Sequence, residues 1–141
     1  MDNINLAGKR KNMTIAAVKS IFVGVGGSLI LGVFCLTFID MDKILFIMPL
    51  FIAFNGAMTG YRLVEVLKNQ IKNIPVFSLV LGIGCGALTF VAVNFAGSFI
   101  RNGFLLNDVL LLSIYDLLIY MAVSGFTSYL GAKLAVRYFN L

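Results

Sequence analysis

The stretch Leu110–Leu134, LLLSIYDLLIYMAVSGFTSYLGAKL, decides how this chain folds. It is longer than the ~20 residues with which an α-helix crosses the hydrocarbon core of a bilayer. Its apolar residues form continuous runs and do not alternate with polar ones, which excludes a strand of a membrane β-barrel. Asp116 is the only acidic residue deep inside an apolar run of this sequence. The stretch therefore predicts a membrane-spanning helix that carries one carboxylate.

The composition extends this prediction to the whole chain. Of its 141 residues, 60% are hydrophobic and only 12% are charged, and the mean hydropathy is +1.00. Soluble globular domains carry more polar surface than this composition can supply. We therefore expect an all-α integral membrane protein, with a single domain over residues 1–141 and no separate soluble module.

Four apolar segments divide the chain. The first follows a polar, basic start and is too long for a cleaved signal peptide, so an uncleaved signal-anchor is expected. The second contains Pro49, which favours a kink, and the third opens with Pro75, a residue suited to the first turn of a helix. We predict membrane spans over about 20–39, 44–61, 75–100 and 109–132, and a short surface helix over about 62–73.

Lys and Arg are distributed unequally between the two sides that these spans define. Nine of the eleven lie in the N-terminal region, in the segment after the second span, or at the C-terminus. The other two are Lys43 and Arg101, in the opposite loops. By the positive-inside rule, both termini are expected in the cytoplasm, with the chain in a bacterial cytoplasmic (inner) membrane.

The sequence also contains a weak internal repeat. Val23–Gly26 in the first span aligns with Leu81–Gly84 in the third, and Gly56–Tyr61 in the second aligns with Gly125–Tyr129 in the fourth after one gap. This alignment suggests two helical hairpins related as a parallel 2+2 repeat. Independent use of glycine in membrane helices would give the same pattern, so both interpretations stay open.

Small residues spaced four apart form a helix-packing pattern on all four predicted spans. Residues four apart share one face of a helix, and side chains this small let two backbones approach closely in lipid. We expect a tight bundle, either with internal packing alone or with a further contact to a second copy or another membrane subunit. The packing residues are Gly24, Ser28, Gly32, Gly56, Gly60, Gly82, Gly86, Ser124 and Ser128.

Asp116 is the main candidate for a polar intramembrane site. A carboxylate near mid-membrane costs on the order of 3 kcal/mol on insertion scales, so it finds a partner, faces a cavity or stays protonated. At ~1.5 Å per residue, Asp116 lies about 12 Å below Asp108, a depth close to that of Asn94. Tyr120 follows one turn later, and Asn55 lies near mid-depth in the second span. Two interpretations stay open: a structural hydrogen bond from Asn94 or Tyr120 to a largely protonated Asp116, or a hydrated path in which Asp116 responds to protons or cations.

Enzymatic and cofactor-dependent functions are not expected. The sequence has no His and no C-x-x-C motif, and its two cysteines, Cys35 and Cys85, each lie in an apolar segment as small hydrophobic residues. Neither paired carboxylates nor a cluster of metal ligands is found. The basic residues lie at the ends of segments and do not form a nucleic-acid-binding face. We therefore predict no catalysis, no metal, no cofactor and no nucleic-acid partner.

The layout resembles the GtrA-like family of small four-helix membrane proteins. The resemblance rests on Phe22-Val23-Gly24 in the first span and on Arg62 and Arg137 after the second and fourth spans, and it covers most of the chain. It implies four membrane helices and a role in moving lipid-linked sugars across a bilayer. The polar Asn that this family has in its first helix is absent. Small multidrug transporters are of similar size, but their first helix carries a carboxylate that this chain lacks.

Two functions stay open from the sequence. The leading hypothesis is a non-enzymatic inner-membrane protein that acts through helix–helix association, as a homo-oligomer or as a subunit or regulatory partner of a membrane assembly. The small-residue faces and the short loops favour it. The alternative is a small oligomeric transporter or flippase for an ion, a proton-coupled solute or a lipid-linked substrate, which would use Asp116.

Overall fold

The structure is a computed structural model that describes residues 2–35, 37–67, 73–102 and 112–139. Over these residues it is entirely helical, with no strand. The helices are α1 (Asp2–Cys35), α2 (Met41–Leu67), α3 (Ile74–Asn102) and α4 (Ile114–Tyr138). The prediction of an all-α chain with four long helices is confirmed.

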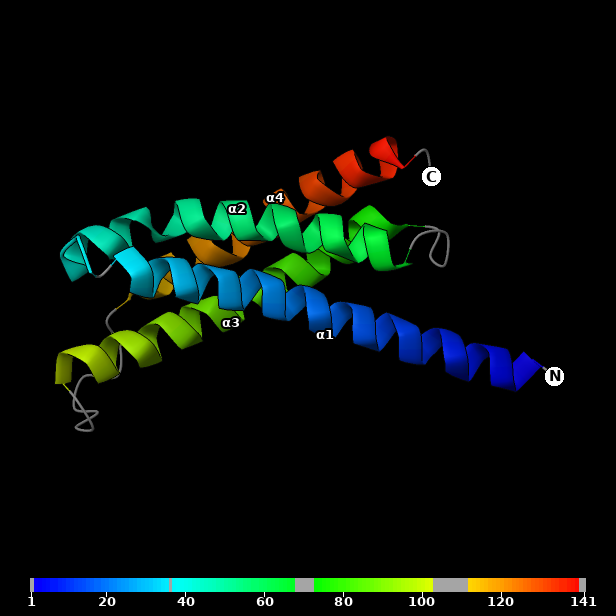
Figure 1. Cartoon of the computed structure of the whole chain (residues 1–141), viewed down its shortest axis with the longest axis horizontal. Coiled ribbons are helices and arrows are strands. Elements are labelled where there is room, and N and C mark those ends of the chain that lie inside the picture. The colour runs from blue at the N-terminus through cyan, green and yellow to red at the C-terminus, as the bar shows by residue number, and fades with distance from the viewer. Residues whose placement is uncertain (1, 36, 68–72, 103–111, 140–141) are drawn as a thin grey trace.

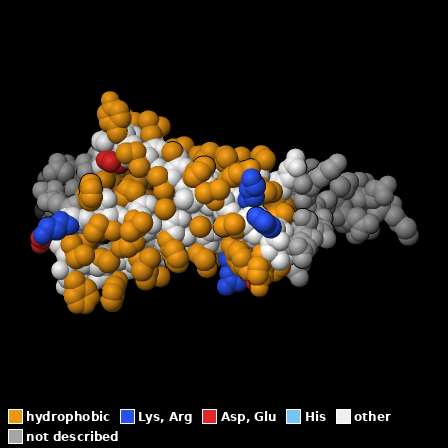
Figure 2. Space-filling view, turned by 90° about the horizontal axis from the view of Figure 1, so that it is seen from above, with side chains coloured by type: hydrophobic (Ala, Val, Ile, Leu, Met, Phe, Trp, Pro, Cys, Tyr) orange, Lys and Arg blue, Asp and Glu red, His pale blue; other side chains and the backbone are white. Residues whose placement is uncertain are grey.

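Each helix is long and apolar enough to cross a membrane. The candidate spans are Lys11–Cys35, Lys43–Leu67, Ile74–Ile100 and Ile114–Tyr138. The shortest has 25 residues, about 37 Å at ~1.5 Å per residue, which exceeds the ~30 Å thickness of a hydrocarbon core. In the space-filling view, hydrophobic side chains cover most of this body, and Lys and Arg lie toward its ends (Figure 2).

The helix bounds differ from the predicted ones at several helix ends. α1 begins at Asp2, so the polar start of the chain is already helical. α2 runs through Pro49 without interruption and continues to Leu67, so residues 62–67 belong to α2 and not to a separate surface helix. The buried residues Leu63, Val64 and Leu67 keep the helical spacing of α2 to its end. Residues 68–72 of the predicted surface helix, residues 103–108 of the predicted loop and residues 109–111 of the predicted fourth span lie outside the described residues.

α4 lies at the centre of the packing. It makes its contacts with α2 and α3, whereas α1 packs on α2 and, less extensively, on α3 (Figure 1). The start of α1 and the end of α4 lie at the same end of the bundle (Figure 1). One buried cluster near that end joins α1, α2, α3 and α4, and a second occupies the opposite half. Their members are Ala16, Leu63, Val64, Leu67, Ile74, Ala132 and Ala135 in the first, and Ile44, Met48, Ile52, Phe90, Val93, Leu112 and Tyr120 in the second.

Glycines explain how close the helices around α4 come. A Cβ atom added at Gly60 would collide with the backbone carbonyl of Ser128, and one added at Gly131 would collide with that of Ala57. On the other side of α4, a Cβ at Gly82 would lie 2.6 Å from the carbonyl oxygen of Ser124. Because no side chain separates the backbones, van der Waals contact is made along both crossings of α4.

Candidate functional site

The sequence predicts that Asp116 lies deep inside a continuous apolar helix. The structure does not place it there. α4 begins at Ile114, after the N-cap residue Ser113, so Asp116 is in the first turn. The backbone N–H and the hydroxyl of Ser113 both donate to Asp116 Oδ2, at 2.8 and 3.0 Å. A carboxylate at this position satisfies an N–H group that the helix leaves unpaired and faces the positive end of the helix dipole. Its primary role in the structure is that of a helix cap.

Asn94 binds the backbone of Leu112, the residue before the N-cap Ser113. Its side-chain oxygen accepts a 3.0 Å hydrogen bond from the backbone N–H of Leu112, and its amide donates to the carbonyl of Phe90 at 2.9 Å. Asn94 is buried on α3, with 6% of its surface exposed. Asn94 and Asp116 therefore bind consecutive backbone N–H groups, and together they fix where the chain enters α4. The sequence places these two side chains at a similar depth, and the structure brings both of them to this one turn.

Tyr120 lies one turn after Asp116 but is not bonded to it. Its side chain is almost completely buried, and its ring packs edge-on against Phe90 with the ring centres 6.2 Å apart. Within the described residues, the Tyr120 hydroxyl has no hydrogen-bond partner. The structure therefore does not show the hydrogen bond from Tyr120 to Asp116 that one of the two interpretations allows. Leaving such a group unpaired costs about 1–3 kcal/mol.

Asn55 belongs to a different interface. Its amide donates to the carbonyl of Phe51 at 2.9 Å, and its side-chain oxygen occupies the space that a Cβ at Gly27 would need. It therefore lies between α2 and α1, whereas Asp116 and Asn94 lie between α3 and α4. The structure does not join the four predicted polar residues into one path.

Two further polar contacts link neighbouring helices. Ser78 on α3 and Ser128 on α4 exchange hydrogen bonds: each hydroxyl donates to the other residue's carbonyl at 3.0 Å, and the two hydroxyl oxygens are 2.8 Å apart. Between α1 and α2, the Thr59 hydroxyl lies 3.3 Å from the carbonyl oxygen of Ser20 and 2.8 Å from that of Asn55. Ser128 and Asn55 are among the predicted residues, whereas Ser20, Thr59 and Ser78 are not. Ser20 and Ser78 each lie four residues before a predicted glycine, so the spacing rule could have found them.

The predicted packing residues all lie inside the bundle. Gly24 and Gly32 face side chains of α2, and Gly82 and Gly86 face the backbone of α4. Ser28 uses its hydroxyl within α1, where it donates to the carbonyl of Gly24 at 2.8 Å. Gly27, Gly125 and Gly131 also lie against neighbouring helices, but they fall outside the four-residue spacing that identifies the predicted packing residues. Gly26 and Gly84 differ from all of these, because no heavy atom lies within 4 Å of a Cβ built at either position.

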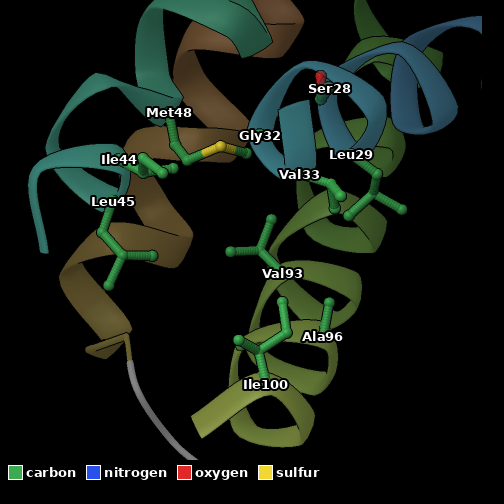
Figure 3. A pocket seen from close by; sticks show the side chains of 11 residues that line it. Ser28, Leu29, Gly32, Val33, Ile44, Leu45, Met48, Val93, Ala96 and Ile100 are labelled. Carbon is green, nitrogen blue, oxygen red and sulfur yellow. The ribbon is translucent and has the colours of Figure 1, made fainter. Parts of the chain in front are cut away.

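The chain also has an apolar hollow between α1, α2 and α3. It encloses a volume of about 40 Å³, and its lining includes Leu29 and Val33 of α1, Met48 of α2, and Val93 and Ile100 of α3 (Figure 3). Ser28 contributes the one hydroxyl of the lining, which is already bonded within α1. Among the described residues no three His, Cys, Asp or Glu side chains come together as metal ligands. The described residues thus form contacts between helices and an apolar hollow.

No model of a known protein family matches this chain, and no curated protein or solved structure matches it either. The resemblance to the GtrA-like family therefore stays a prediction.

Proposed function

We propose that the four helices cross a bacterial cytoplasmic membrane, with both termini in the cytoplasm. Four apolar helices of sufficient length support this, as does the location of both chain ends at one end of the bundle (Figure 1). The excess of Lys and Arg near these ends gives the orientation. Reporter domains fused after residue 141 and within residues 103–108 should report opposite sides of the membrane. The same side for both fusions would contradict the proposal.

We propose further that the protein is non-enzymatic and acts through helix–helix association with another membrane protein or a second copy. The single observation that carries this proposal is the uneven burial of the helices. In the apolar window of α1 only 22% of residues are buried, against 33–39% in the other three helices. α1 packs on α2 and α3 along one face and leaves the opposite face to its surroundings.

The outer face of α1 is the proposed docking surface. Phe22 and Ile30 are 74% and 71% exposed, and Gly26 lies between them with open space where a side chain would stand. A glycine flanked by large apolar side chains lets a second helix approach closely and pack between them. Gly84 on α3 has the same open space, but α3 is buried over a larger share of its length than α1, and the predicted packing glycines already lie against neighbouring helices.

Site-specific photocrosslinking in the intact membrane tests this surface. A photoreactive amino acid at Phe22 or Ile30 should give discrete adducts with protein, because a partner helix lies against that face. The matched control is Val80 on the outer face of α3, which is 61% exposed and should crosslink mainly to lipid. Equal yields of protein adducts at all three positions, or adducts at Val80 alone, would remove α1 as the docking surface.

We propose that the two hairpins form a parallel repeat. Ser20 and Ser78 precede the aligned residues Gly24 and Gly82 by four positions, and the carbonyl of each accepts a hydroxyl from the following helix in the chain. The donors, Thr59 and Ser128, align with each other when the single gap is placed at Gly60. A permuted chain in which residues 73–141 precede residues 1–72 should keep its topology and assemble. Failure of that chain to assemble would argue that the glycine patterns arose independently.

A second candidate function, transport, is favoured by one observation. The buried hydroxyl of Tyr120 has no partner in the described residues, and Asp116 lies one helical turn away. A transported ion or proton would use such a pair. Flux measured in proteoliposomes should fall at least tenfold in Asp116→Asn and stay unchanged in the exposed control Asp40→Asn. Unchanged flux in Asp116→Asn would remove this residue from the mechanism, and no flux in the unmodified protein would remove transport altogether.

A further inference from the structure

We propose that the hollow between α1, α2 and α3 binds one acyl chain of a phospholipid. This inference rests on the proposed membrane location of the helices and goes beyond the association proposed for α1. The hollow lies where α1 and α3 end and α2 begins, so it is at the membrane end opposite the termini. The space that it encloses is about 40 Å³, several times the roughly 10–15 Å³ that one water-sized group needs, so it takes a few methylene groups of the chain.

The shape of the hollow suits a chain that enters end-on. Val33 and Ile100 lie toward the ends of α1 and α3 and are 54% and 52% exposed, so they mark the rim on its open side, whereas Ile44, Met48 and Val93 are buried (Figure 3). Ile100 and Val93 are seven residues apart on α3, which corresponds to about 10 Å along the helix. The hollow is therefore deep enough for a run of methylene groups.

The chemistry of the lining decides between water and hydrocarbon. A buried water needs two to four polar partners, and the lining offers one hydroxyl, that of Ser28, which already donates to the carbonyl of Gly24. An empty hollow would leave Leu29, Val93 and Ile100 without contacts on one side. At this depth the surrounding medium is lipid, so an acyl chain is the occupant that supplies those contacts.

Charged groups near the rim match a phospholipid headgroup. Lys43 and Asp40 form an exposed ion pair, with 3.4 Å between Lys43 Nζ and Asp40 Oδ2. The carbonyl of Asp40 accepts the backbone N–H of Ile44 at 3.1 Å, which holds this pair one turn from the lining of the hollow. An ammonium beside a carboxylate complements a headgroup that carries a phosphate and an amine. The ligand class is therefore a phospholipid with an amine-bearing headgroup.

The absence of Trp from the sequence gives a direct test, because an introduced Trp is the only such fluorophore. In Val33→Trp the reporter lies at the rim, and in the control Leu88→Trp it lies on the outer face of α3, which is 49% exposed. Phosphatidylethanolamine with brominated acyl chains is added to the purified full chain in mixed micelles. Half-maximal quenching should require at least fivefold less of this lipid for Val33→Trp than for Leu88→Trp. Identical quenching curves would overturn the proposal.

Two sets of variants make the result specific. Ala96→Phe and, independently, Leu29→Phe fill the hollow, so each should shift the quenching curve of Val33→Trp onto that of the control Leu88→Trp. An unchanged quenching curve, in variants whose circular dichroism stays helical, would overturn the proposal. Lys43→Ala should weaken quenching by the brominated phospholipid but not by a brominated diacylglycerol. A partner side chain in the hollow would instead exclude the lipid and leave only the control quenched. If the helices did not contact lipid at all, neither reporter would be quenched, which separates this failure from a failure of the membrane proposal.

Discussion

The α1–α2 and α3–α4 interfaces are both lined with glycines, but the glycines meet different atoms. On α1, Gly24 faces the hydroxyl of Thr59, and Gly32 faces Met48 Sδ, which lies 3.2 Å from a Cβ built there. On α3, Gly82 and Gly86 face backbone carbonyl oxygens of α4. A side chain moves aside by rotating, whereas a helix backbone moves only with its whole helix. The α3–α4 interface is therefore fixed, and the α1–α2 interface can adjust.

The hydrogen bonds between α3 and α4 also differ from those between α1 and α2. Ser78 and Ser128 join α3 and α4 through reciprocal bonds. Between α1 and α2, Thr59 reaches the carbonyl of Ser20 only at 3.3 Å, and the Ser20 hydroxyl has no partner in the described residues. The polar contacts that hold α1 on α2 are therefore fewer and longer than those that join α3 and α4.

The largest effect is expected from Gly86→Leu in the fixed interface. The new side chain would collide with the backbone of α4 at Tyr120, so α3 and α4 would separate and the free energy of unfolding would fall by about 3 kcal/mol or more. Thermal unfolding in detergent, followed by circular dichroism, measures the loss. The control Gly84→Leu lies two residues away in open space and should unfold like the original chain. Similar losses in both variants would show that glycine itself, and not the contact, is required.

A smaller and repairable effect is expected from Gly24→Ala in the adjustable interface. The added methyl group meets the Thr59 hydroxyl, which rotates at a cost of about 1–2 kcal/mol in unfolding free energy. Thr59→Ala removes that hydroxyl, so the double variant should recover most of the loss in a double-mutant cycle. Strictly additive losses would mean that the backbone and not the side chain limits the approach of α1.

The two serines that occupy similar places on α1 and α3 should respond differently to alanine. Ser78→Ala removes a bonded hydroxyl and should cost about 1 kcal/mol. Ser20→Ala removes a hydroxyl without a partner in the described residues and should be neutral or slightly stabilising. Detergent unfolding of the two variants side by side measures the difference, and equal losses would contradict the assigned bonds.

The smallest difference is expected at the acidic residues near the starts of α4 and α2. Asp116→Ala removes a helix cap and should cost about 1 kcal/mol. Asp40→Ala removes an exposed ion pair with Lys43 and should cost at most about 0.5 kcal/mol. The same unfolding assay compares them. A cost for Asp116→Ala no larger than that for Asp40→Ala would show that capping is not the role of Asp116.

The number of helices and their packing residues could be predicted from the sequence, because each follows from a regular pattern. Long apolar runs indicate spans, and small residues four apart indicate a common face. The partner of each face could not be predicted in this way, since periodicity says which residues share a face and not which helix covers it. Gly32 against Met48 is an example, because nothing in the pattern of α1 specifies a thioether opposite that glycine.

The start of α4 was mispredicted for a different reason. Leu110, Leu111 and Leu112 extend the apolar run in front of Ser113, so hydropathy places the helix start too early. The capping signal was nevertheless present, as Ser113 followed three residues later by Asp116. Weighing that signal against hydropathy would have located the helix start and assigned the carboxylate to the cap.

The central place of α4 has a consequence for biosynthesis. α4 leaves the ribosome after α1, α2 and α3, yet Gly60 on α2 and Gly82 on α3 both pack on it. Most domains begin to fold from their N-terminal part during translation. During synthesis, the place that α4 occupies against α2 and α3 stays open until α4 itself has been made. Delayed translation of α4 would leave that place open to any other helix with a small-residue face, so the order of synthesis itself makes assembly vulnerable.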